Sequence, residues 1–247
     1  MIVSRFTNKT IIGILIATNI FAAGFIIFGR NETKVAEITL AGGTQQNKPK
    51  YSFKDNASYV EKMSLFSIYG KKGKIVMLGN SITERVDWAE LLKRDDIINR
   101  GVGSDITEGY LSRMEYIYSV NPKVCYIMGG VNDIAKNVPL QETVQNIIKI
   151  IEGLKQHHII PVLQSVLYVA DIYPNHQVMN QKIEGMNVEL VKAAKEGKVQ
   201  FMNLNDLLSS DKQLIKEYVL KDGIHLNGPG YVKWRSVLLA DLKERGL

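Results

Sequence analysis

Several features that would assign a function at once are missing from this chain of 247 residues. It has one cysteine, Cys125, so an intramolecular disulfide is impossible, and its apolar neighbours favour a buried, inert thiol. No internal repeat or low-complexity tract is apparent. Residues 1–30 hold three of the 31 basic side chains and no acid, so the rest of the chain has 28 basic against 25 acidic residues. This small excess excludes a nucleic-acid footprint.

Histidine is also scarce, with four in the chain. His157 and His158 are adjacent at the end of a predicted helix, and a regular helix cannot aim both at one metal ion. Solvated capping of the helix end explains them better, so we expect no metal site. The composition is 45% hydrophobic and 23% charged, which indicates a folded domain with a sizeable core.

An apolar run without a charge covers the eighteen residues 11–28, preceded by Arg5 and Lys9 and closed by Arg30. It is long enough to cross a bilayer and longer than the roughly 7 to 15 apolar residues of a signal peptide. We therefore expect an uncleaved signal anchor with a transmembrane helix. A cleaved signal peptide is one alternative, because small residues occur inside the run. A buried helix of the domain core is the other.

This interpretation divides the chain into three parts. Residues 1–30 are the anchor, residues 31–50 are a linker rich in Gly, Thr, Gln and Asn, and residues 51–247 are the functional domain. Because N-terminal anchors of this kind usually export the domain that they carry, we expect a membrane-anchored domain outside the cytoplasm. Secretion after cleavage is the alternative location.

Strand-like and helix-like segments alternate after residue 74. This alternation predicts a three-layer α/β/α sandwich with a five-stranded, doubly wound parallel sheet. An additional helix over 58–69 is expected to lie against the domain before the first strand. The predicted strands are 75–78, 97–98, 124–128, 159–167 and 199–204, and the predicted helices between and after them are 105–118, 140–157, 177–197 and 230–245.

Polar turn residues follow three of these strands. Ser81 follows the first strand directly, Gly103 and Ser104 follow the second, and Asn132 follows the third. The carboxyl ends of parallel strands share one edge of the sheet, where ligands bind, so these groups are expected to lie together. Taken singly, these residues have ordinary structural alternatives: Ser81 as a helix cap, and Asn132 with Asp133 as the start of a helix.

Asp222 and His225 stand three residues apart near the C-terminus. At that spacing the carboxylate can orient the imidazole and stabilise its cation. The chain order Ser, Asp, His is an order that suits a nucleophile, an orienting group and a base. The alternative is that Asp222 belongs to a simple turn and that His225 is a surface histidine. The three strand ends and this pair together make a coincidence of four such groups hard to accept.

These blocks resemble those of the SGNH hydrolases, also called the GDSL esterase/lipase superfamily. The nucleophile block is similar to residues 79–82, the second block to residues 99–105, the GxND block to residues 130–133 and the DxxH block to residues 222–225. Their order and separation fit over residues 74–247. The resemblance implies a flavodoxin-like fold and an esterase that needs no metal or organic cofactor.

The resemblance also implies roles for single residues. Ser81 would attack an ester carbonyl, His225 would carry the proton, and Asp222 would hold its tautomer. The oxyanion hole would consist of the backbone N–H groups of Ser81 and of Gly103 or Ser104, with the side chain of Asn132. Two positions depart from the family pattern: Asn80 replaces the usual Asp, and Ser104 stands where a Gly is usual, which leaves Gly103 and Ser104 as alternative donors.

The expected substrates are small O-acyl esters, with O-acetyl groups on carbohydrate as the first choice. Cleavage of lysophospholipids or thioesters is the alternative within the superfamily. A non-catalytic flavodoxin-like module that binds a glycan or phosphate is an alternative of another class, and a purely structural surface protein is a third. A binding module has no need for Asp222 and His225 at their spacing.

Overall fold

The computed structural model describes residues 51–247, so the transmembrane segment and linker predicted for residues 1–50 lie outside the described part. Five parallel strands form one sheet in the order β2-β1-β3-β4-β5, the flavodoxin-like order. This confirms the predicted five-stranded parallel sheet. The strands are β1 (Ile75–Gly79), β2 (Ile97–Gly101), β3 (Val124–Met128), β4 (Ile160–Gln164) and β5 (Gln200–Met202).

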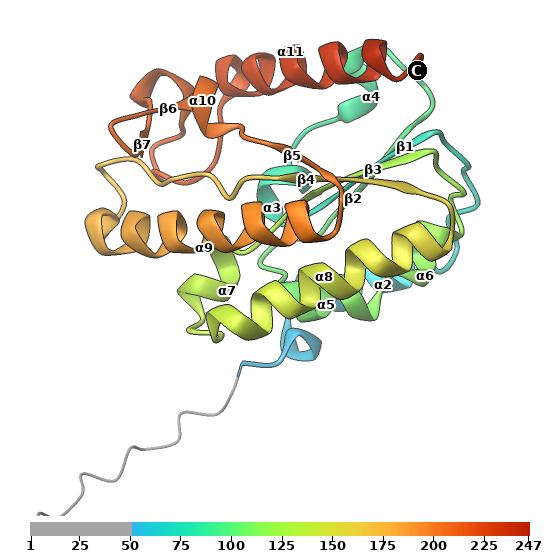
Figure 1. Ribbon diagram of the computed structural model, residues 1–247, viewed down its shortest axis with the longest axis horizontal. Coiled ribbons are helices and arrows are strands. Elements are labelled where there is room, and N and C mark those ends of the chain that lie inside the picture. Colours follow the sequence, from blue (N-terminus) through green and yellow to red (C-terminus); the bar gives the residue numbers. More distant parts are fainter. Residues whose placement is uncertain (1–50) are drawn as a thin grey trace, which may run out of the picture. The chain divides into compact units, whose positions relative to one another are not determined.

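Helices cover both faces of the sheet, which confirms the three-layer architecture (Figure 1). Because β1 and β3 are buried on both faces, every residue in them is inaccessible, which explains their unbroken apolar runs. One face carries α5 (Thr107–Ser112), α6 (Glu115–Tyr118), α8 (Leu140–Gln156) and α9 (His176–Glu196), and the other carries α4 (Trp88–Leu92), α10 (Asn205–Leu208) and α11 (Gly228–Glu244).

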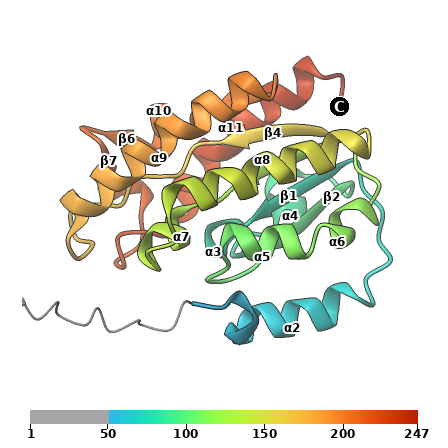
Figure 2. The same ribbon diagram turned by 60° about the horizontal axis from the view of Figure 1, so that its bottom comes forward.

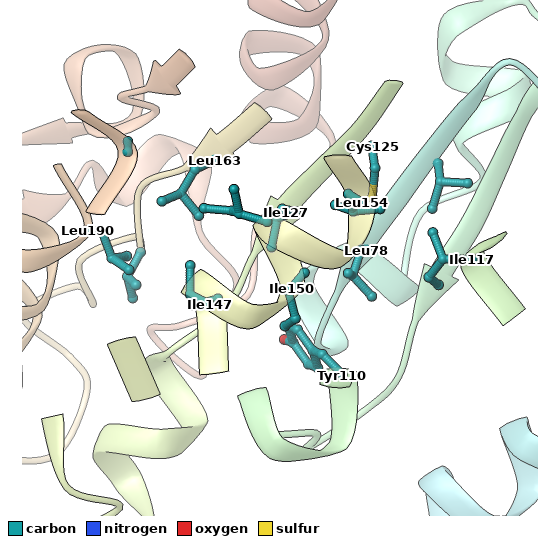
Figure 3. Packing of buried hydrophobic residues seen from close by; sticks show 14 of the residues in the cluster. Leu78, Tyr110, Ile117, Cys125, Ile127, Ile147, Ile150, Leu154, Leu163 and Leu190 are labelled. Carbon is teal, nitrogen blue, oxygen red and sulfur yellow. The ribbon is translucent and has the colours of Figure 1, made fainter. Parts of the chain in front are cut away.

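Each face has its own hydrophobic core. In the core under α8, Ile147, Ile150 and Leu154 meet Leu78, Ile127 and Leu163 of the central strands (Figure 3). In the opposite core the two tryptophans, Trp88 and Trp234, pack edge to face with ring centroids 4.9 Å apart. Trp88 is therefore a packing residue.

A third, smaller core lies under the N-terminal segment, which contains η1 (Phe53–Asp55) and α2 (Ala57–Phe66). Phe53, Tyr59 and Phe66 pack there on Val102 and Ile106. Figure 2 shows α2 as an additional element on the outside of α5. The predicted helix over 58–69 therefore exists, begins one residue earlier and ends at Phe66.

Several predicted elements were too long, and the strand predicted over 199–204 covers only β5. The helix predicted over 105–118 is broken between α5 and α6, where Arg113 adopts a non-helical backbone and turns its buried guanidinium inward. The strand predicted over 159–167 ends at Gln164, because the side chains of Asn187 and Asn205 bond the following backbone. The short elements β6 (Ser209–Ser210), β7 (Gln213–Leu214) and η2 (Lys216–Tyr218) were not predicted.

Within residues 51–247 no helix is both long and apolar enough to span a membrane. The strand order reverses around β1, which pairs with β2 on one side and β3 on the other. In sheets of this kind, ligands bind beyond the carboxyl ends of the strands at such a reversal. The first, second and third predicted junctions all follow strands that meet there.

Candidate active site

Ser81 is the first residue of α3 (Ser81–Glu84), the short helix that follows β1. The preceding Asn80 caps this helix, because its Oδ1 accepts a hydrogen bond of 2.9 Å from the Ile82 N–H. Gly79 allows Thr83 of this helix to pack close to the end of β1, since a Cβ at Gly79 would lie 1.9 Å from the Thr83 hydroxyl. The replacement of the family's Asp by Asn80 thus keeps the cap, although the buried Nδ2 has no hydrogen-bond partner among the described residues.

Asp222, His225 and Ser81 form a continuous chain of hydrogen bonds. The Ser81 Oγ lies 2.8 Å from His225 Nε2, and His225 Nδ1 lies 2.7 Å from Asp222 Oδ2. The second carboxylate oxygen, Oδ1, accepts the backbone N–H groups of Ile224 and His225 at 3.1 and 3.0 Å. The structure therefore brings these three residues together, although Ser81 and His225 are 144 positions apart in the sequence.

The surroundings of Asp222 keep its carboxyl ionised. Partial burial by itself raises the pKa of Asp222, but the backbone N–H groups of His225 and Ile224 and the His225 ring outweigh it and hold the pKa below its ordinary value. Arg85, at the end of α3, adds a cation 3.8 Å from Oδ2. The Asp222 side chain is 42% exposed and that of His225 only 14%, so the carboxylate faces solvent while the imidazole is shielded.

Backbone N–H groups without a partner lie at the ends of β1 and β2. Neither the Ser81 N–H nor the Ser104 N–H has a hydrogen-bond acceptor among residues 51–247. Ser104 has a left-handed backbone with φ of 57°, the conformation that a Gly adopts most easily, whereas Gly103 has no positive φ. The segment of residues 102–105, which we call the oxyanion loop, is tied to β1 by the Val102 N–H bond to the Gly79 carbonyl.

Asn132 approaches the oxyanion loop from the third junction. It lies in α7 (Val131–Ala135), which begins after Gly130, and the φ of 128° at Gly130 is available to Gly but strained for other residues. Its Nδ2 donates to the Asp105 carbonyl at 2.9 Å, which leaves the second amide hydrogen for another acceptor. The three junctions thus meet at one place.

A buried ion pair supports the oxyanion loop from beneath. Arg113 Nε lies 2.9 Å from Asp105 Oδ2, and both side chains are completely buried. The same guanidinium donates to the carbonyls of Arg100 and Gly79, at the ends of β2 and β1. Burial raises the pKa of Asp105 to about 6, and the charge and hydrogen bond of Arg113 oppose this rise.

Asp133, the neighbour of Asn132 in the chain, fixes α7 against adjacent helices. Its Oδ1 accepts hydrogen bonds from the Thr107 hydroxyl at 2.6 Å, the Thr107 N–H at 3.1 Å and the Thr143 hydroxyl at 3.3 Å. Burial raises the pKa of Asp133, while the bonds from Thr107 oppose the rise. The carboxylate thereby holds α5, α7 and α8 in one arrangement.

No sequence pattern assigned roles to Arg113, Asp133 or Arg85. Arg113 lies inside a segment with the pattern of one continuous helix, so nothing local marks it as a buried cation. Asp133 belongs to the GxND block, and its place in that block was the one feature of the sequence that could have indicated its role. Arg85 is four residues from Ser81, but its approach to Asp222 depends on the tertiary fold.

Two aromatic residues after β4 occupy different places. Tyr173 packs beside the loop that carries Asp222 and His225, where a Cβ at Gly223 would contact its backbone and Cβ. Tyr168 instead lines a cavity of about 600 Å³ with Glu184 and Phe201, and neither Ser81 nor His225 borders that cavity. Of the two, only Tyr173 is therefore placed beside the segment that carries Asp222 and His225.

A parallel α/β/α domain with a Ser–His–Asp hydrogen-bond chain at the reversal of strand order defines the class of serine hydrolases. Residues 77–233 match the model of the GDSL-like lipase/acylhydrolase family, and the chain belongs to this family. It is accordingly a carboxylic ester hydrolase.

Individual relatives agree with this assignment. The isoamyl acetate-hydrolyzing esterase of Saccharomyces cerevisiae is 26% identical over 173 residues, which cover 61% of this chain and 70% of that protein. A GDSL-like lipase from Bacteroides thetaiotaomicron shares 25% identity with a TM-score of 0.65, over 76% of this chain and 98% of that structure. The structure of an acetyl xylan esterase has the same fold, with 18% identity and a TM-score of 0.57. The match covers 68% of this chain and 98% of the chain of that esterase.

Proposed function

We propose that this protein is a serine esterase that removes small acyl groups, chiefly acetyl groups, from hydroxyls of carbohydrate. The observation that carries the proposal is the hydrogen-bond chain from Asp222 through His225 to Ser81. It ends beside the Ser81 N–H and the oxyanion loop, which offer donors without a partner among the described residues. A site that only binds a glycan would not need these three side chains in one series of hydrogen bonds.

In the proposed mechanism, the Ser81 Oγ attacks the ester carbonyl carbon while His225 Nε2 takes its proton. Asp222 keeps the other ring nitrogen protonated and stabilises the cation that forms. The Ser81 N–H, the Ser104 N–H and Asn132 Nδ2 donate to the oxyanion, as a hole of this kind requires. Of the two alternatives, we assign the second backbone donor to Ser104 because its left-handed backbone matches the Gly that is usual in the family.

The two halves of the reaction then balance. The tetrahedral intermediate collapses, the carbon–oxygen bond to the alcohol breaks, and the alcohol leaves with the proton from His225. Water attacks the acyl-Ser81 ester, gives a proton to His225, and releases the carboxylic acid while the proton returns to Ser81. No step of this sequence requires a metal or an organic cofactor.

The choice of substrate has two supports. The yeast relative hydrolyses an acetate ester according to its name, which favours a short acyl group. The exposed sides of Asp222 and Ser104 leave space for a large polar alcohol such as a sugar. Preference for long acyl chains or thioesters would instead favour the lysophospholipase or thioesterase alternative.

The direct test is covalent labelling of the full chain with a fluorophosphonate probe. We expect the probe to modify Ser81, and we expect the Ser81→Ala variant to remain unlabelled while keeping its circular dichroism spectrum. The same preparations should release acetate from an acetylated xylo-oligosaccharide only when Ser81 is present. Folded protein that neither reacts with the probe nor releases acetate would favour a binding module.

We also propose that residues 1–30 anchor the domain in a membrane, with residues 31–50 as a linker and residues 51–247 outside the cytoplasm. The uncharged run of residues 11–28 supports the anchor. Cell fractionation with a C-terminal tag tests this proposal. The anchored form should sediment with membranes and resist extraction by carbonate, and a shortened protein in the medium would instead show cleavage and secretion.

A further inference from the structure

The oxyanion loop is held from outside by a segment that lies before the family-matched residues 77–233. We call residues 51–56 the N-terminal strap. The Asn56 Nδ2 donates to the Gly103 carbonyl at 2.8 Å, and the Tyr51 hydroxyl donates to the Ser104 carbonyl at 3.4 Å. Both peptide groups that flank the Ser104 Cα are therefore restrained by the strap.

The first of these bonds acts on the proposed oxyanion donor itself. The Gly103 carbonyl and the Ser104 N–H belong to the same peptide group, which is planar and trans, so they point in opposite directions. A side chain that holds the carbonyl on one side consequently aims the N–H towards the other. A bond accepted by the carbonyl also polarises the peptide and strengthens its N–H as a donor.

Asn56 is itself fixed at both ends of its carboxamide. Its Oδ1 accepts the Ser58 N–H at 3.1 Å and thereby caps α2, so its Nδ2 has a defined direction towards the loop. The strap is packed as well as hydrogen-bonded, because the Phe53 ring meets Tyr59 edge to face at 5.0 Å and the Lys136 ammonium lies 3.6 Å from the centre of the Tyr51 ring.

The backbone conformation of Ser104 explains why the oxyanion loop requires this support. Ser104 has a φ of 57°, and a non-glycine residue in this region is strained unless its surroundings hold it there. Its side chain is exposed and makes no hydrogen bond among residues 51–247, so Ser104 does not stabilise its own conformation. The bonds from Asn56 and Tyr51 supply the restraint from outside.

We propose that Asn56 is a positioning residue for catalysis, which acts on the oxyanion through the Gly103–Ser104 peptide. The inference rests on the proposed esterase function. It predicts that Asn56 affects the transition state more than the binding of substrate, since the oxyanion forms only during the reaction.

The test compares the full chain with its Asn56→Ser and Asn56→Asp variants, both of which keep a good helix cap but remove the donor to Gly103. We expect kcat for p-nitrophenyl acetate to fall about tenfold and KM to change by less than about twofold, since complete loss of an oxyanion donor typically costs about 10² to 10³. The Ki of phenylboronic acid, which forms a tetrahedral adduct with serine, should rise in parallel with the loss of kcat.

Ser52→Ala is the matched control, because the Ser52 hydroxyl caps η1 in the same strap by accepting the Lys54 N–H and, among residues 51–247, makes no hydrogen bond to the oxyanion loop. Its kcat and Ki should equal those of the wild type. Unchanged kcat in both Asn56 variants, or equal losses in Ser52→Ala, would overturn the positioning role while the esterase function stands. A wild-type chain without Ser81-dependent turnover would overturn the esterase function and this inference with it.

Discussion

At the scale of single residues, the site depends on which hydrogen bonds Asp222 makes. One carboxylate oxygen meets the His225 ring, and the other is occupied by two backbone N–H groups. The carboxylate is therefore fixed in direction before it acts on the ring. A carboxamide of the same shape would keep part of this arrangement but present the wrong hydrogen-bonding group to Nδ1.

The first prediction concerns the Asp222→Asn variant. We expect its kcat for p-nitrophenyl acetate to fall by about 10³ to 10⁴, since the amide favours the wrong tautomer of His225. Fluorophosphonate labelling should slow by a comparable factor, while thermal unfolding changes little because this side chain is partly exposed. Arg85→Ala is the control, since its weak, exposed contact with Asp222 predicts less than about a threefold change. Equal activity of Asp222→Asn and wild type would contradict the assigned role.

At the scale of elements, the break between α5 and α6 links the fold to the site. The break lets Arg113 turn under the oxyanion loop and reach the ends of β1 and β2 as well as Asp105. A straight helix would place this cation elsewhere. The buried pair thus determines where the loop and two strands meet.

The second prediction comes from that geometry. Arg113→Met should lower the free energy of unfolding by about 3 to 5 kcal/mol, because it leaves the Asp105 carboxylate buried without its partner. The double variant Asp105→Asn, Arg113→Met should recover part of this loss, since it buries no unpaired charge. Urea denaturation of all three proteins measures the effect. A single variant as stable as the wild type would show that the pair does not hold the loop.

The third prediction concerns pH. Because the pKa of Asp105 is raised to about 6 from an ordinary 3.8, the folded protein binds this proton more tightly than the unfolded chain. The stability that Asp105 contributes is therefore fully present below its ordinary pKa and is lost as the pH rises through about 6. The free energy of unfolding, measured relative to Asp105→Asn, should decline across this window. A constant difference between the two proteins would contradict the raised pKa.

At the scale of the whole molecule, the parallel sheet carries the site at one edge, and helices bury its two faces. Ile150 lies in α8 and is fully buried against the central strands, whereas Val188 lies in α9 and is 50% exposed. The two positions therefore offer a matched pair of apolar residues on long helices. Substitutions at these two positions test whether a loss of stability in the core also changes the activity of the site.

The fourth prediction uses this pair. Ile150→Ala should lower the free energy of unfolding by about 2 to 5 kcal/mol through a cavity in the core, while Val188→Ala should change it by less than about 0.5 kcal/mol. Both should keep the wild-type kcat at temperatures where they remain folded. Calorimetry and esterase assays on the same samples measure the two properties. Loss of kcat in folded Ile150→Ala would show that the core and the site are coupled.

The sheet could be predicted from the sequence because its strands are buried on both faces and form apolar runs. Ser81, Asn132, Asp222 and His225 were predicted from their positions after strands and from their spacing, and the structure places these groups together. Arg113 was missed because a buried cation inside a helix-like segment has no local pattern. Asn56 was missed because its contact with Gly103 joins residues 47 positions apart. The anchor in residues 1–30 stays a prediction.

Ser81 is the residue on which the proposed hydrolysis of short acyl esters depends. The measurement that tests this dependence most directly compares p-nitrophenyl acetate with the octanoate ester, using the full chain and its Ser81→Ala variant. We predict turnover that depends on Ser81 and a higher kcat/KM for acetate. Octanoate preference would contradict the acetyl substrate and favour a lipid ester, and folded protein without Ser81-dependent turnover on either ester would contradict the esterase mechanism itself.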